Sequence, residues 1–243
     1  MKATLVACHP VTATTLHTLA IDIGGSGLKA SVLDAKGAMV CDRVRVDTPV
    51  GSHPDEVVRA LVALCGQLPP FDRIAVGFPG MVRDGIVRTA PNLGHEAWAG
   101  YPLALELERN LQKPARLAND ADVQGLAAIA GKGLEMVITL GTGFGTSLYL
   151  DGKLCPHLEI AHLPFRKGET FDVQLGDAAR KDVGGKKWNK RVQKAILLLR
   201  ALTHFDHLYI GGGNAKKIDF ELSADITLVD NSAGICGGVH LWR

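Results

Sequence analysis

The feature that most constrains the fold is an order of elements that occurs twice, in residues 19–37 and again in residues 136–152. Each copy begins with an apolar run typical of a strand, passes through a glycine-rich turn into a second strand, and ends at a short polar turn. A fixed order that repeats within one chain is typical of a duplicated unit. The repetition therefore predicts two related domains.

Apolar strands alternate with helical periodicity around the two copies, which predicts an α/β fold. Helices are predicted at residues 54–64, 103–111, 119–130 and 186–203, and a terminal helix is predicted from residue 231. No low-complexity linker separates the copies, so we expect a hinge at Ala118 and Asn119 beside an interdomain cleft. The predicted domains are residues 1–118, with 1–18 as a loose extension, and residues 119–243, with the terminal helix 231–243 packing back on the first domain.

Composition places the chain among soluble globular proteins. Its 243 residues are 47% hydrophobic and 21% charged, and no window has the length and apolar character of a membrane span or a signal peptide. A net charge of +2 is too small to indicate nucleic acid as a partner. Five scattered cysteines without a C-x-x-C pair indicate reduced thiols, a cytoplasmic protein and no zinc site.

Three glycine-rich turns follow apolar strands and are the candidate phosphate-binding elements. They are Gly24, Gly25, Ser26 and Gly27; Gly141, Thr142 and Gly143; and Gly211, Gly212 and Gly213. Without Cβ atoms the backbone approaches an anion closely, and successive N–H groups bind phosphate oxygens. The P-loop and dinucleotide-binding sequences are absent. Each turn could alternatively be a simple hairpin connection.

Asp22 ends the first strand, directly before the first glycine turn. A carboxylate there could hold Mg²⁺ through water or orient the phosphates, and the alternative is a local turn cap.

Asn119 and Asp120 open the helix at the predicted hinge. Phosphoryl transfer needs a carboxylate that accepts the proton of the attacking hydroxyl, and a neighbouring amide can fix that hydroxyl. Helix capping is the alternative for Asn119, and it is compatible with catalysis by Asp120. We interpret Asp122 as first-turn charge that complements the helix dipole.

Glu159, His162 and Asn92 are candidates for binding a polyol. Carboxylate, imidazole and amide groups together match the donors and acceptors of several sugar hydroxyls. Taken singly, each is an ordinary loop residue, and no nearby cysteines complete a zinc site with His162.

These motifs resemble the ROK family of sugar kinases and repressors, within it the polyphosphate glucokinase branch. The carrying segments are residues 22–29, 77–80, 91–93, 119–121, 140–143 and 210–213. The resemblance implies a duplicated actin-like ATPase (ribonuclease H-like) fold with the sugar between the domains and Asp120 as the base. It places Asn92, Asn119, Glu159, His162 and Gly80 around the sugar, and Lys29 with the glycine turns at the phosphate donor.

The same resemblance implies phosphorylation of glucose, at its 6-hydroxyl, with ATP or polyphosphate as donor, Mg²⁺ as cofactor and a homodimeric state. Family members usually have E-x-G-H where this chain has Ala161 before His162. If that glycine needs a positive φ, alanine costs strain and disturbs His162. The zinc-binding cysteine cluster of many members is absent.

Seven basic residues and one acidic residue lie between positions 180 and 194. A basic track suits a polyphosphate donor, with Lys186, Lys187, Lys190 and Arg191 as candidates. The alternative is a solvated helix face, and Trp188 anchors that helix to the core.

Two other functions stay open at this point. A non-catalytic sugar-sensing regulator would share the fold, although the 18 residues before Leu19 are too few for a helix-turn-helix unit. A kinase for another hexose or an amino sugar would use the same residues.

Overall fold

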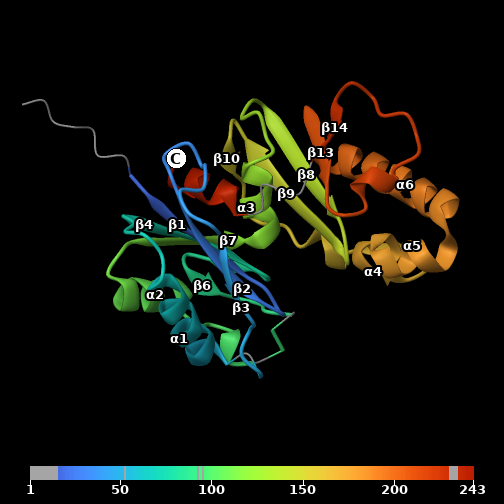
Figure 1. Ribbon diagram of the computed structural model, residues 1–243. Helices are drawn as coiled ribbons and strands as arrows, with labels where there is room; N and C mark the ends of the chain where they lie inside the picture. The colour runs from blue at the N-terminus through green and yellow to red at the C-terminus, as the bar shows by residue number, and fades with distance from the viewer. Residues whose placement is uncertain (1–15, 52, 92, 95, 230–234) are drawn as a thin grey trace, which may run out of the picture.

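The computed structural model describes residues 16–51, 53–91, 93–94, 96–229 and 235–243. Two five-stranded sheets lie beside each other, each covered by its own helices, and a thin helical layer lies between them (Figure 1). We call each sheet with its outer helices a lobe, N-terminal or C-terminal by its place in the chain.

The N-terminal sheet has the strand order β3-β2-β1-β4-β7. Its strands are β1 (Thr18–Ile23), β2 (Leu28–Leu33), β3 (Val44–Val46), β4 (Arg73–Phe78) and β7 (Ala115–Asn119). β1 pairs antiparallel with β2 and parallel with β4, and β7 is parallel to β4. The apolar residues of β1 and β4 are almost fully buried, as strands covered on both faces require.

The C-terminal sheet repeats this arrangement with the order β10-β9-β8-β13-β14. Its strands are β8 (Leu134–Leu140), β9 (Phe144–Leu150), β10 (Lys153–Leu154), β13 (His207–Gly211) and β14 (Ile226–Leu228). β8 pairs antiparallel with β9 and parallel with β13, just as β1 pairs with β2 and β4. The shared pattern confirms the predicted α/β fold with duplicated units.

The outer helices of the N-terminal lobe are α1 (Pro54–Cys65) and α2 (Leu103–Leu111). Proline at the first position and an acidic first turn favour the start of α1. Val57, Leu61 and Leu64 recur at helical spacing and are buried in the core of this lobe.

The C-terminal lobe carries α4 (Phe171–Leu175), α5 (Asp177–Val183) and α6 (Gly185–Thr203). Trp188, Val192 and Leu199 form the buried stripe of α6, and the Trp188 indole donates a 2.8 Å hydrogen bond to the Leu175 carbonyl. The predicted role of Trp188 as a core anchor is therefore confirmed.

The layer between the sheets consists of α3 (Asp120–Leu126) and the 3₁₀ helix η5 (Cys236–Trp242). The backbone of η5 runs against α3, and a Cβ on Gly237 would lie 1.8 Å from the Val123 carbonyl oxygen. Only glycine permits that approach. Through this packing η5 also contacts β1, β4 and β7 of the N-terminal lobe.

Two predicted helices differ from the observed ones. The helix predicted to reach residue 130 ends at Leu126, because the buried Glu135 carboxylate accepts hydrogen bonds from the backbone N–H groups of residues 130–132. The terminal helix predicted from residue 231 is a 3₁₀ helix over Cys236–Trp242, where two glycines disfavour an α-helix, and residues 231–234 lie outside the described residues. The division into domains at residues 118 and 119 stays a prediction.

Short elements complete the chain. They are β5 (Val82–Arg83), β6 (Ile86–Val87), η1 (Glu96–Trp98), η2 (Ile160–His162), β11 (Pro164–Arg166), β12 (Glu169–Thr170) and η3 (Ala215–Lys217). Among the described residues, no helix is both long and apolar enough to cross a bilayer.

Candidate active site

A cavity of about 430 Å³ lies between the lobes, with walls from both sheets and from α3. The predicted site residues that line it are Asp22, Gly80, Asn119, Asp120, Gly141, Thr142, Gly143, Glu159, His162, Gly212 and Gly213. Residues from positions 22 to 213 therefore meet in one place, as a site between two duplicated units requires. Asn92 lies outside the described residues.

Asp120 stands where β7 passes directly into α3. Asn119 fixes this junction, since its Oδ1 accepts a 2.9 Å hydrogen bond from the Ala121 N–H and its Nδ2 donates a 3.1 Å bond to the Gly80 carbonyl. The capping interpretation of Asn119 is thus confirmed. One amide hydrogen and one oxygen lone pair remain available for a ligand.

The Asp120 side chain is open to the cavity, yet the surrounding walls displace much of its water. This burial, together with the negative charges of Asp22 and Asp122, raises the pKa of Asp120 to about 6. A carboxylate with a pKa close to neutrality is a stronger proton acceptor than an ordinary aspartate. The geometry and the basicity suit a general base.

Asp22 lies across the cavity from the glycine turn of the second sheet and forms an ion pair with Lys29 at 2.9 Å. The two residues are direct neighbours in the β1–β2 register. This pair keeps the Lys29 amine on β2, and Lys29 does not line the cavity. Asp22 is a partly exposed carboxylate in the cavity lining, which fits Mg²⁺, since this ion usually keeps several waters and binds one or two carboxylates plus phosphate.

Of the three predicted phosphate-binding turns, the turn at residues 141–143 faces the cavity most fully, together with Gly212 and Gly213. Gly212 has a φ of +91°, and a Cβ there would lie 2.3 Å from the Leu140 carbonyl oxygen. Gly212 therefore allows the two turns to pack against each other.

Gly24, Gly25, Ser26 and Gly27 are not among the residues that line the cavity, and their phosphate-binding role stays a prediction. The Gly24 N–H donates to the Gly27 carbonyl, and Thr48 and Arg45 donate to the carbonyls of Gly24 and Ser26. The turn connects β1 to β2. Gly211 is the last residue of β13, where it pairs with Thr139 of β8, and it does not line the cavity.

His157 is a site residue that the sequence did not reveal. Its Nδ1 lies 2.9 Å from Asp122 Oδ2, and its Nε2 lies 3.5 Å from Glu159 Oε1. Burial disfavours the charged imidazole, but the hydrogen bonds to Asp122 and Glu159 outweigh it and raise the pKa of His157 to about 10. His157 is therefore an imidazolium at neutral pH, and its hydrogen bond in turn lowers the pKa of Glu159.

Asp122 lies in the first turn of α3, as predicted. Its side chain is 2% exposed and also binds His157, a contact that its position on the helix did not reveal. Burial raises the pKa of Asp122, and the hydrogen bond from His157 offsets part of that rise.

Glu159 and His162 reach the cavity from the 3₁₀ turn η2, 3.7 Å apart between Oε2 and Nε2. Ala161 lies between them and is not among the residues with positive φ. The strain considered for alanine at this position is therefore absent. A second, mostly apolar cavity of about 470 Å³ adjoins Glu159 and His162 and includes Trp98 and Pro91.

Asp172 is another lining residue that the sequence did not reveal. From α4, its Oδ1 accepts a 2.7 Å hydrogen bond from the Phe144 N–H and lies against Gly143. In the sequence it looks like an ordinary first-turn acid of a short helix. Only the packing of α4 on the 141–144 turn reveals its place.

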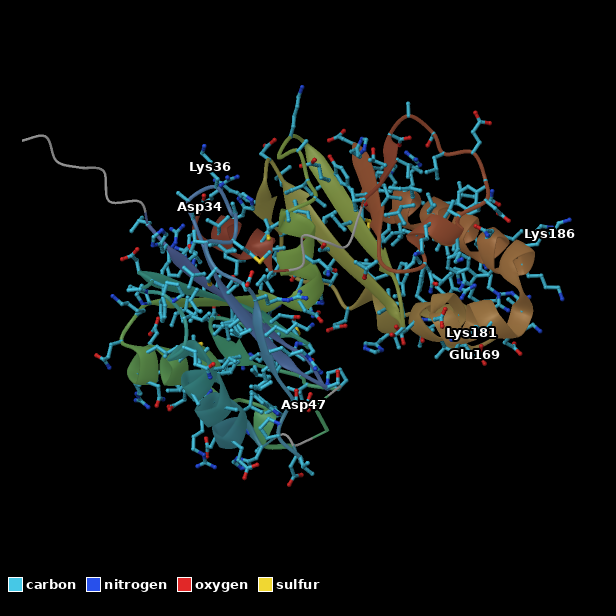
Figure 2. The ribbon with its side chains drawn as sticks, viewed as in Figure 1. Asp34, Lys36, Asp47, Glu169, Lys181 and Lys186 are labelled. Carbon is cyan, nitrogen blue, oxygen red and sulfur yellow. The ribbon has the colours of Figure 1, made fainter. Side chains whose placement is uncertain are left out.

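The candidate polyphosphate track does not line the cavity. Lys186, Lys187 and Lys190 are exposed, and Lys186 extends from the far end of the C-terminal lobe (Figure 2). Arg191 donates to the Gln174 carbonyl at 3.2 Å. Within the described part of the chain, no group of three or more His, Cys, Asp or Glu side chains could hold a metal ion.

Two sheets of the same topology with a cavity between them form the duplicated actin-like fold, and the similar sugar kinases reported below make the chain a phosphotransferase that acts on an alcohol group. The model of the ROK family matches residues 18–160. The chain belongs to the ROK family, which confirms the resemblance.

Individual relatives agree with this assignment. Polyphosphate glucokinase of Mycobacterium tuberculosis is 31% identical over 219 residues, 86% of this chain and 82% of that protein. The crystal structure of inorganic polyphosphate/ATP-glucomannokinase from Arthrobacter sp. strain KM has a TM-score of 0.79 and 30% identity, covering 92% of this chain and 97% of the other. N-acetylmannosamine kinase of Escherichia coli is 37% identical over 146 residues, 57% of this chain and 49% of that protein.

Proposed function

We propose that the protein phosphorylates glucose at its 6-hydroxyl, with polyphosphate or ATP as donor and Mg²⁺ as cofactor. The observation that carries the proposal is Asp120, a carboxylate of raised pKa that faces the glycine turn at residues 141–143 within one cavity. The similar glucokinase and glucomannokinase support a hexose as the acceptor.

Each cavity wall has a role in this reaction. Asp120 accepts the proton of the attacking hydroxyl, while Asn119, Glu159 and His162 bind other hydroxyls and orient the sugar. The turn at residues 141–143 binds the phosphates of the donor through the N–H groups of Thr142 and Gly143, while the Gly141 N–H donates to the Gly143 carbonyl and closes the turn. Asp22 would hold Mg²⁺, which would supply positive charge to neutralise the donor phosphates. Closure of the lobes excludes water, which would compete for the phosphoryl group.

The test is glucose phosphorylation by the purified protein with Mg²⁺, comparing ATP with long-chain polyphosphate. Asp120→Asn should lower kcat by at least about 10²-fold, because the proton has no acceptor. Asp42→Asn, an exposed aspartate outside the cavity, is the matched control and should behave like wild type. Wild-type inactivity with every hexose tested would favour a sugar-sensing regulator instead.

The apolar cavity beside Glu159 and His162 favours a second candidate, a kinase for a hexose that carries an apolar substituent such as an N-acyl group. The partial similarity to N-acetylmannosamine kinase supports it. Comparing kcat/KM for glucose and for N-acylated hexosamines separates the two candidates.

The basic N-terminal part of α6, which carries Lys186, Lys187, Lys190 and Arg191, is the proposed contact for a long polyphosphate donor. Lys186→Met/Lys187→Met should raise the KM for polyphosphate and leave the KM for ATP unchanged, since both lysines lie outside the cavity. A cytoplasmic location and a homodimer are further proposals that rest on the family resemblance. Sedimentation of the purified protein tests the dimer.

A further inference from the structure

A third cavity of about 400 Å³ lies beside the end of β7, and it shares no lining residue with the active-site cavity. It is bounded by β7 of the N-terminal lobe, by the β9–β10 turn of the C-terminal lobe and by the last residues of the chain. β7 and β10 are edge strands of their sheets, so the cavity lies where the two lobes meet.

Positive charge dominates its lining. The side chains of Arg116, Lys153 and Arg243 contribute three positive charges, against the carboxylate of Asp84 and the α-carboxylate of Arg243 among the described residues of the wall. None of the three forms an ion pair with another described residue. Such a concentration of like charge in a concave site favours an anion.

The guanidinium of Arg116 is held in place before any ligand binds. Its Nη1 donates a 2.6 Å hydrogen bond to the Leu241 carbonyl, and its Cζ lies 4.6 Å from the centre of the Trp242 ring. A fixed guanidinium loses less conformational entropy when it binds an oxyanion than a free side chain would.

His240 provides an independent observation. It lines the same cavity, and its Nδ1 is buried without a hydrogen-bond partner among the described residues. Burial and the nearby charge of Arg243 lower the pKa of His240. A buried imidazole nitrogen without a partner costs stability, and a small rotation of the ring toward the cavity would let it form a hydrogen bond with a phosphate oxygen of a ligand.

We propose that this cavity is a binding site for a small phosphate-bearing anion. Arg116, Lys153 and Arg243 would bind its oxygens, and His240 would complete the set. The volume accommodates inorganic phosphate, pyrophosphate or a hexose phosphate. Because Ala118 in its wall directly precedes Asn119 and Asp120, an occupant that joins β7 to the β9–β10 turn would also bias the closure of the lobes.

Trp242 offers a local reporter for binding. The chain has three tryptophans, of which Trp98 and Trp188 are buried in the two lobe cores, whereas Trp242 stacks against Arg116 and Arg73. Inorganic phosphate, pyrophosphate and glucose 6-phosphate are each titrated while tryptophan fluorescence is recorded. Comparing the three titrations shows which kind of phosphate compound binds. Trp242→Phe should abolish the change in fluorescence.

Arg116→Gln/Lys153→Met should weaken the fluorescence-detected binding by at least tenfold. Lys36→Met/Arg59→Gln removes the same charge from exposed positions away from the cavity and should bind as wild type does. Calorimetry of the same variants counts sites, and we expect wild type to bind one more pyrophosphate than the Arg116/Lys153 variant. Circular dichroism verifies that each variant is folded. If the Arg116→Gln/Lys153→Met variant does not fold, Lys153→Met alone is measured in its place.

Equal affinity and site number in wild type and the Arg116/Lys153 variant would overturn the proposal, as would a response that survives Trp242→Phe with unchanged site number. The measurements need no turnover. Failure of the proposed kinase activity would therefore leave this result intact, and the reverse also holds.

Discussion

The imidazole of His157 and the carboxylate of Asp122 form an ion pair, 2.9 Å apart, between the helix that begins at Asp120 and the segment that carries Glu159. The side chains are 9% and 2% exposed, so water screens the pair little. The Tyr149 hydroxyl donates a 2.7 Å bond to the Asp122 carbonyl and ties the same turn of α3 to β9. The pair thus links the base-bearing helix to the candidate sugar-binding residues.

Breaking this pair should destabilise the protein. His157→Asn should lower the free energy of unfolding by about 3–5 kcal/mol, because it leaves a buried aspartate without its partner. His157→Asn/Asp122→Asn should recover part of the loss. Urea denaturation of wild type, His157→Asn, Asp122→Asn and the double variant gives the coupling energy, and simple additivity of the single effects would contradict the pairing.

The same pair predicts a pH window for stability. The folded pKa of His157 is about 10 and its ordinary value is 6.5, so the pair contributes fully below pH 6.5 and loses its contribution as the pH rises toward 10. The difference in unfolding free energy between wild type and His157→Gln should therefore shrink from pH 6.5 to pH 10. A difference that stays constant over this range would show that His157 is neutral in the fold.

The ionised side chain of Asp120 should lower the free energy of unfolding at neutral pH, although activity requires it. Its folded pKa of about 6 exceeds the ordinary 3.8, so its ionisation costs stability as the pH rises from 3.8 to 6. Asp120→Asn should stabilise the fold at pH 7 by about 1 kcal/mol, a value reduced because the group is open to solvent. Thermal unfolding at pH 4 and pH 7 checks this, and a gain of equal size at both values would refute it.

The activity should show the matching profile. The wild-type kcat/KM should fall below about pH 6 as Asp120 becomes protonated. Asp22→Asn removes a neighbouring negative charge and should lower the pKa of Asp120. The pH below which the remaining activity of this variant falls should therefore be lower than in wild type. An unchanged pH would mean that another group controls the fall in activity.

Gly212 and Gly213 form a matched pair for testing the packing of the two turns. Gly212→Ala should destabilise the protein by about 1–3 kcal/mol and raise the KM for the phosphate donor, because its φ is +91° and its Cβ would contact Leu140. Gly213→Ala meets no atom within 4 Å and should change stability by less than about 0.5 kcal/mol. Chemical denaturation and donor titrations compare them, and similar effects at both positions would argue against the close approach.

Ala161→Gly restores the residue that is usual in the family. Since Ala161 has no positive φ, glycine relieves no strain and should change the KM for the sugar less than about twofold. It should cost about 0.5–1 kcal/mol of stability through backbone entropy. A large gain in activity would show that the alanine does impair His162.

The sequence by itself determined the duplicated α/β units, most of the long helices and part of the cavity lining, since each depends on local periodicity or on a short motif. Asn119 and Asp120 were predictable because one short segment ends a strand and caps a helix. The glycine turns were predictable as turns for the same reason, although which turn faces the cavity was not.

Only the tertiary structure decided how distant segments meet. His157 and Asp122 are 35 positions apart, and Asp172 reaches Phe144 across 28 positions. The first glycine turn is bound by Arg45 and Thr48, which belong to later segments, and it is not among the residues that line the cavity. Ion pairs and turn contacts of this kind depend on how the layers pack, and side-chain type along the chain carries no record of that packing.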